Sequence, residues 1–135
     1  MIVVDTNVIA NAVLPGDSSE LVRSAAARDP RWIAPALWRI ELRNVLATAM
    51  RLRALPLDSA LAAFEAAEHF VVDARIEPTA AESLELSARG GISAYDAEFV
   101  FVAERLDLLL VTGDRKLPKA FPGRAVSIAD FAAEP

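Results

Sequence analysis

Four acidic side chains occupy positions that a purely structural design would avoid, and together they could bind a metal ion. They are Asp5, Glu41, Asp96 and Asp114. Asp5 directly follows an apolar run at residues 2–4, and Asp114 follows a second apolar run at residues 108–112. In an open parallel sheet, sites form in the crevice beyond the carboxyl ends of the strands. We therefore expect these two acids to face one crevice.

The other two acids lie in predicted helices, beside apolar side chains. Glu41 has Leu37 and Val45 as neighbours one turn away, so it borders the apolar stripe of its helix. On a helical wheel Asp96 lies beside Val100 and away from the most charged side of its helix. Neither carboxylate is therefore expected to point straight into solvent.

Carboxylates that converge in a partly buried crevice repel one another, and burial raises their pKa values. A divalent cation removes both penalties. The chain has no cysteine and a single histidine, His69, so the ligands would all be oxygens, which favours Mg²⁺ or Mn²⁺ over zinc. Such an ion can activate and orient a water for in-line attack on phosphorus. The same composition excludes a Cys–His pair, and we interpret His69 as a packing or surface residue.

Each acid also has a structural interpretation when it is considered alone. Asp5 and Asp114 could cap the helix or turn that follows them. Ser93 and Asp96 match a plain capping box. Glu41 could be a solvated or salt-bridged residue at a helix margin. It is less plausible that all four acids have only these structural roles at the same time.

Short apolar runs alternate with helical patterns along the whole chain. Strands are expected at residues 2–4, 32–34, 70–72, 108–112 and 125–128. Helices are expected at residues 6–14, from 17 onward, at 35–53, 58–68, 78–90 and 93–106, and after 129. Asp17, with Glu20 completing a capping box, and Asp58 are the expected N-caps. Strands that alternate with helices indicate an α/β fold with a parallel sheet covered on both faces.

The composition fits one globular domain. With 135 residues, of which 54% are hydrophobic, the chain can fill one core, and we treat residues 1–135 as a single domain. No apolar run is long enough to span a bilayer, and the first residues lack the basic start of a secretion signal. We therefore expect a cytoplasmic protein without a membrane partner.

The net charge of −5 argues mildly against a nucleic-acid partner, because such proteins are usually basic. A bound metal ion would neutralise part of that charge, and local basic patches matter more than the total. Arg115, Lys116 and Lys119 closely follow Asp114 and are the candidates for contacts with phosphate. They are equally well explained as a solvated basic turn.

Four segments of the chain resemble the PIN-domain ribonucleases, in particular the VapC-type toxins of bacterial toxin–antitoxin pairs. They are V-D-T-N-V-I at residues 4–9, W-R-I-E-L-R-N-V-L at residues 38–46, S-A-Y-D-A at residues 93–97 and L-V-T-G-D-R-K-L at residues 110–117. They occur in the order found in the family, and the resemblance covers essentially the whole chain. It implies a three-layer α/β/α fold with a central, mainly parallel sheet of about five strands and acids clustered at the strand ends.

Carried onto the matching positions, the resemblance implies a catalytic quartet of Asp5, Glu41, Asp96 and Asp114. Asp5 and Asp96 would be the firmest metal ligands, with Asp114 joining directly or through water. Glu41 would bind a second ion or position the attacking water. The flanking polar residues Thr6, Asn7 and Thr112 would orient these groups, although helix-start and strand-end roles explain Asn7 and Thr112 equally well. Gly113 is a minor departure from the family pattern and could loosen Asp114.

The implied activity is endonucleolytic hydrolysis of RNA with Mg²⁺, for which Mn²⁺ could substitute. The resemblance also implies a homodimer and a VapB-like antitoxin that blocks the site. A stripe of Leu57, Leu61 and Phe64 could serve such a partner, although core packing explains it as well.

Two other functions are alternatives to a ribonuclease. A phosphatase of the haloacid-dehalogenase kind would need a second aspartate two residues after Asp5, where this chain has Asn7. A non-catalytic PIN-like scaffold that acts as an antitoxin partner or co-repressor is the stronger alternative. Because all four acids are present, we expect an active enzyme instead of a scaffold that has lost its activity.

Overall fold

Five short strands form one parallel sheet in the computed structural model, which describes residues 1–134. The sheet order is β3–β2–β1–β4–β5. The strands are β1 (Ile2–Val4), β2 (Trp32–Pro35), β3 (Val71–Ala74), β4 (Leu110–Thr112) and β5 (Ala125–Ser127). In the central pairings Val3 lies opposite both Ile33 and Leu110. Because all strands run in the same direction, their carboxyl ends meet at one edge of the sheet.

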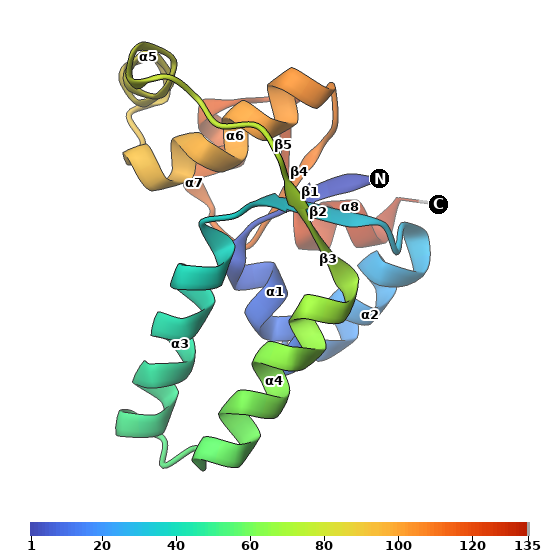
Figure 1. The fold of residues 1–135 in the computed structure, drawn as a ribbon. Coiled ribbons are helices and arrows are strands. Elements are labelled where there is room, and N and C mark those ends of the chain that lie inside the picture. Colours follow the sequence, from blue (N-terminus) through green and yellow to red (C-terminus); the bar gives the residue numbers. More distant parts are fainter. Residues whose placement is uncertain (135) are drawn as a thin grey trace.

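The described residues form eight helices, of which the first seven lie between strands and α8 follows β5 (Figure 1). They are α1 (Thr6–Val13), α2 (Ser19–Arg28), α3 (Trp38–Leu52), α4 (Leu57–Phe70), α5 (Ala80–Gly90), α6 (Ala94–Leu106), α7 (Lys116–Ala120) and α8 (Ile128–Ala133). In Figure 1, α5 and α6 lie on one side of the sheet, whereas α1, α2 and α4 lie on the other, and α3 and α4 project together away from it. The expected α/β fold with a five-stranded parallel sheet is confirmed.

The three central strands β2, β1 and β4 are buried on both faces, which is why they read as mainly apolar runs, whereas Val72 of the edge strand β3 is 54% exposed. Every residue of β1 and β4 is buried, and Val3, Val4 and Val111 are completely inaccessible. Helix α6 covers one face with buried side chains that include Phe99 and Val100. None of the helices in residues 1–134 is long and apolar enough to cross a membrane.

Two of the predicted helix starts are wrong. Helix α2 begins after Ser18 and has no side-chain cap, so Asp17 and Glu20 do not form a capping box. Helix α3 begins at Trp38 instead of residue 35, because Pro35 extends β2 and pairs with Ala74 of β3. At α3 the pairing of Pro35 with β3 overrides the local signal, whereas at α2 the backbone N–H and the hydroxyl of Ser19 both bond to the carbonyl oxygen of Gly16.

The bounds of α4 and the region around β4 also differ from expectation. Pro56, in an extended conformation, is the N-cap of α4, and Asp58 lies in the first turn. Helix α4 runs to Phe70, so β3 begins one residue later than predicted and reaches Ala74. Strand β4 is shorter than predicted, and the short helix α7 was not predicted at all.

Gly90 ends α5 at a point where the helix touches Phe121. A Cβ atom at residue 90 would lie 2.4 Å from Cε2 of the buried Phe121 ring. We expect Gly90→Ala to lower the free energy of unfolding by about 1–3 kcal/mol, because the ring must move within a packed core. Urea unfolding measures this change. Gly16→Ala is the matched control, since nothing lies within 4 Å of the added methyl group. Equal loss of stability in both variants would contradict the packing explanation.

Candidate active site

Asp5 connects β1 to α1 and ties the ends of two neighbouring strands together. Its carboxylate is nearly buried, with 7% of the residue exposed. Oδ1 accepts a hydrogen bond from the backbone N–H of Val8 at 3.1 Å, which makes Asp5 the N-cap of α1. Oδ2 accepts hydrogen bonds from the Thr112 hydroxyl and from the N–H of Gly113, the latter at 3.2 Å. The capping interpretation is therefore correct for one oxygen, while the other fixes the end of β4.

The segment after β4 continues this network to Asp114. The Thr112 hydroxyl oxygen accepts a hydrogen bond from the N–H of Asp114 at 2.9 Å, while the hydroxyl donates to Asp5. One oxygen of Asp114 then accepts from the N–H of Lys116 at 2.7 Å, at the start of α7. Asp114 therefore caps a local turn, as its structural interpretation proposed, and its position is coupled to Asp5 through one completely buried threonine.

Glu41, in the first turn of α3, is joined to the start of α1. The Thr6 hydroxyl donates a hydrogen bond to Oε1 of Glu41 at 2.8 Å. Thr6 is buried, whereas the neighbouring Asn7 is exposed. A Cβ atom at Gly113 would lie 3.2 Å from that of Asn7, so glycine at this place allows the loop after β4 to pass close to α1.

Asp96 lies in the first turn of α6. Its N–H donates to the Ser93 hydroxyl at 3.0 Å, which makes Ser93 the N-cap of this helix. The capping interpretation thus explains the hydrogen bond made by the backbone N–H of Asp96. The half-buried carboxylate itself faces the same crevice as the other three acids.

The four acids meet in one small cavity at the carboxyl edge of the sheet. This cavity, which we call the acidic crevice, has a volume of about 70 Å³ and is lined by Asp5, Thr6, Asn7, Glu41, Asp96, Phe99 and Asp114. Phe99 is the one lining residue that the sequence did not single out, because its apolar side chain reads as ordinary core. Thr112 does not line the crevice itself, but its hydroxyl donates a hydrogen bond to the lining residue Asp5.

Burial and mutual repulsion raise the pKa values of three of these carboxyl groups. For Asp5 the effect of burial outweighs its hydrogen bonds from Thr112, Val8 and Gly113, and the charge of Asp96 adds to it. Burial also raises the pKa of Glu41 against its bond from Thr6, again with a contribution from Asp96. Burial, followed by the charge of Asp114, raises the pKa of Asp96. The crevice therefore favours protonation or a positive partner.

These shifts predict how the stability of the metal-free protein depends on pH. Because the folded pKa values lie above those of the unfolded chain, their stabilising effect is complete below about pH 4 and is lost as pH rises through the raised values. We expect Asp96→Asn to flatten this loss, because it removes one repelling charge. Urea unfolding in the presence of a chelator, between about pH 4 and pH 8, measures both profiles. Parallel profiles would contradict the predicted repulsion.

The donor atoms of the crevice fit a hard divalent cation. All are oxygens, three of the carboxyl groups have raised pKa values, and a positive ion would relieve them. Within residues 1–134, no three acidic or histidine side chains already form a complete metal cage. Both oxygens of Asp5 already accept hydrogen bonds.

The three predicted phosphate-binding residues follow the crevice residue Asp114 along the chain. Arg115, Lys116 and Lys119 are exposed at the start of α7 and within it, and none forms an ion pair within the described part of the chain. The charge of Lys116 lowers the pKa of Asp96 and so opposes the other influences on that group. Binding of phosphate remains a prediction for all three.

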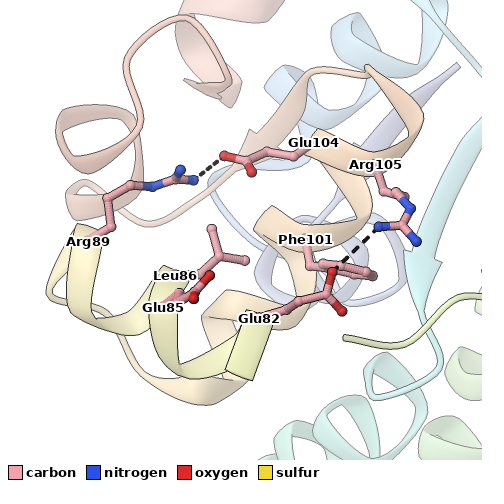
Figure 2. Close-up of a pocket in the computed structure, with 7 residues that line it drawn as sticks. All are labelled: Glu82, Glu85, Leu86, Arg89, Phe101, Glu104 and Arg105. Carbon is pink, nitrogen blue, oxygen red and sulfur yellow. Dashed lines mark hydrogen bonds and ion pairs between the residues drawn. The ribbon is translucent and has the colours of Figure 1, made fainter. Parts of the chain in front are cut away.

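Larger cavities lie elsewhere and have different chemistry. Figure 2 shows one of about 460 Å³ between α5 and α6, whose two guanidinium groups are already paired, Arg89 with Glu104 and Arg105 with Glu82. A groove of about 550 Å³ between α3 and α4 is mostly apolar and is lined in part by the predicted stripe of Leu57, Leu61 and Phe64.

Within that stripe, Phe64 stacks on the buried Trp38, so it serves the core, whereas Leu57 and Leu61 are exposed. His69 is exposed on α4, where its Nδ1 atom contacts the carbonyl oxygen of Glu65. It lines none of these cavities. Its predicted surface role is confirmed.

The chain belongs to the PIN domain family, whose model matches residues 2–121. PIN domains are commonly metal-dependent nucleases. Among solved structures, the crystal structure of PAE2754 from Pyrobaculum aerophilum is similar, with a TM-score of 0.73 over 98% of this chain and 97% of that one. The two sequences are 23% identical, so this likeness supports the fold. Comparison with curated proteins found no match.

Proposed function

We propose that this protein is a Mg²⁺-dependent endoribonuclease that hydrolyses phosphodiester bonds of RNA. The observation that carries the proposal is the acidic crevice, where carboxylates from four separate segments meet at the carboxyl edge of the sheet. PIN domains are commonly nucleases, and this supports phosphodiester hydrolysis as the reaction that these acids catalyse. Oxygen ligands alone favour Mg²⁺, with Mn²⁺ as a substitute.

Asp5 and Asp96, joined by Asp114, are the residues that would hold the ion. When bound there, Mg²⁺ supplies an acidified water and neutralises charge that develops on the phosphate. Asp5 is suited to a fixed ligand, because buried hydrogen bonds to Thr112 and Gly113 hold its carboxylate in one orientation.

The other polar residues orient the acids and the substrate. Thr6 holds one oxygen of Glu41 and leaves the second free to accept a proton from an attacking water. Asn7 borders the crevice on its exposed side, where it can contact the RNA backbone. Arg115, Lys116 and Lys119 supply positive charge for the phosphates that flank the cleaved bond.

The test is cleavage of total cellular RNA by purified protein, free of any bound partner. We expect cleavage with Mg²⁺ or Mn²⁺ and none with a chelator, and mapped ends would reveal the cleavage sequence. Cleavage that ignores the chelator would contradict the metal-dependent mechanism. A generic phosphomonoester serves as the control for phosphatase activity, which the exposed Asn7 in place of an acid does not support.

We further propose that the protein is the toxic component of a cytoplasmic toxin–antitoxin pair. A VapB-like antitoxin and a second copy of the chain would be its partners. The exposed Leu57 and Leu61 beside the apolar α3–α4 groove support a protein partner on this surface. Growth arrest on expression, relieved by the antitoxin, is the expected result. Arrest by a variant that does not cut RNA would instead favour the non-catalytic scaffold or co-repressor.

A further inference from the structure

Helix α3, which carries Glu41, begins without a side-chain cap. Ala36 and Leu37 connect β2 to this helix, and the N-cap residue Leu37 has no polar side chain. The first N–H groups of the helix, those of Arg39, Ile40 and Glu41, bond only to the carbonyl oxygens of Ala36 and Leu37. Because helix ends without a cap tend to fray, other contacts must hold this turn if Glu41 is to keep a fixed position.

Asp73 of the edge strand β3 makes those contacts. Its Oδ1 accepts a hydrogen bond from the indole Nε1–H of Trp38 at 2.7 Å, and its Oδ2 accepts one from Nε of Arg39 at 3.0 Å. Arg39 also pairs with Glu68 of α4, with 2.5 Å between Nη1 and Oε2. Aspartate is uncommon within β-strands. Here its two oxygens bind consecutive residues of the first turn of α3, and we call this arrangement the Asp73 clamp.

Both sides of the clamp are fixed in the fold. Asp73 lies opposite Ala34 in the pairing of β3 with β2. Trp38 is completely buried and stacks on Phe64, with 5.6 Å between the ring centroids. Hydrogen bonds to a charged acceptor are stronger than neutral ones. Without the carboxylate, a buried indole N–H would lose its acceptor, so the turn depends on Asp73 for a bond that packing alone does not replace.

Glu41 lies in the turn that the clamp holds. It follows Trp38 by three residues, so the two side chains are neighbours on the helix surface. Its own carboxylate accepts the Thr6 hydroxyl at 2.8 Å and lines the acidic crevice. Thr6 therefore holds the carboxylate, while the clamp holds the backbone from which that carboxylate extends. Such precision matters, because a misplacement of about 1 Å in a catalytic group can cost about 100-fold in rate.

We propose that Asp73 is a positioning residue for Glu41. Through Trp38 and Arg39 it orders the first turn of α3, and this turn places the Glu41 carboxylate in the acidic crevice. The inference rests on the proposed ribonuclease function and adds to it a residue that does not line the crevice. Asp73 acts through Glu41 and contacts neither the RNA nor the metal ion.

Asp73→Leu tests the proposal, because it removes both acceptor oxygens at similar side-chain volume. The substrate is a labelled RNA with a mapped cleavage site, at a temperature at which every variant is folded. We expect kcat to fall by about 10- to 100-fold with little change in KM, since Glu41 acts on the water and not on RNA binding. Asp73→Asn, which can still accept from Trp38, should retain part of the rate. When Glu41→Gln is already present, Asp73→Leu should cause no further loss.

Hydrogen exchange of the metal-free protein provides a second measurement that does not involve cleavage. We expect the N–H groups of Ile40 and Glu41 to exchange about 10-fold faster in Asp73→Leu, while that of the buried Leu46 in the middle of α3 keeps its rate. A general loss of stability would accelerate all three. Arg39→Gln breaks only the bonds of the partly exposed guanidinium group, so it gives a milder variant should Asp73→Leu not fold.

Asp29→Leu is the matched control. Asp29 also accepts hydrogen bonds from two donors, the amine of Met1 and the N–H of Arg31, but it precedes β2 and so lies at the sheet edge opposite the crevice. Its replacement should lower stability and leave kcat unchanged. An unchanged kcat in Asp73→Leu would overturn the proposal, as would an equal fractional loss in the Glu41→Gln background. If the wild-type protein does not cut RNA, the proposed function itself fails, and this inference fails with it.

Discussion

Replacing Asp96 by Asn is expected to reduce RNA cleavage by at least about 100-fold and to leave the protein folded. The loss follows because an amide cannot supply the negative charge that a hard cation needs, and groups supporting such a site already contribute about 10- to 100-fold. Folding should survive, because the bond between the Asp96 N–H and Ser93 is made by the backbone. Relief of repulsion from Asp114 should even raise the melting temperature of the metal-free protein.

The matched control for this variant is Asp130→Asn. Asp130 occupies the same place in α8, where its N–H donates to the capping Ser127 hydroxyl at 3.0 Å, but it is exposed and lies outside the crevice. Asp130→Asn should leave cleavage unchanged. Near-normal cleavage by Asp96→Asn, at any concentration of Mg²⁺, would mean that this carboxylate has no part in cleavage and that Asp96 serves the helix only through its backbone N–H.

Asp5→Ala is expected to abolish cleavage and also to destabilise the fold. Three donors lose their acceptor, namely the N–H groups of Val8 and Gly113 and the Thr112 hydroxyl. A lost N-cap costs about 0.5–2 kcal/mol and an unsatisfied buried donor about 1–3 kcal/mol. Removal of a buried carboxylate with a raised pKa offsets part of this cost. We expect the free energy of unfolding to fall by about 1–3 kcal/mol, which urea titration measures.

Comparison with Asp5→Asn separates the two roles of this residue. The amide oxygen retains an acceptor for part of the network, so its loss of stability should be smaller, while the loss of activity should be as large. Asp17→Ala is the control for an exposed aspartate without a capping bond. If Asp5→Asn cuts RNA normally, the carboxylate serves the fold alone.

The sequence predicted the sheet well because its three central strands are buried on both faces. In β1 and β4 no residue is exposed to solvent, so their short apolar runs predict buried strands directly. Helix starts were less predictable, because Ser18 and Pro56 precede α2 and α4 without a side-chain cap, whereas Asp17 and Asp58 carry the usual signal. Helix α7 was missed because its five residues include Pro118 and read as a turn.

The four acids were predicted because each follows a buried strand or borders the apolar side of a helix. The family resemblance added the prediction that they form one metal-binding site. The structure brings all four to one crevice, while their catalytic roles remain predictions. The bonds that hold them could not be read from the sequence, since Thr112 to Asp5 and Thr6 to Glu41 join residues far apart in the chain.

Anomalous diffraction from crystals soaked in Mn²⁺ tests most directly whether these acids share a hard cation. We predict a peak in the acidic crevice, within coordination distance of Asp5 and Asp96, that disappears in Asp96→Asn. Mn²⁺ bound elsewhere, or an empty crevice at saturating metal with both carboxylates in their present positions, would contradict the central claim.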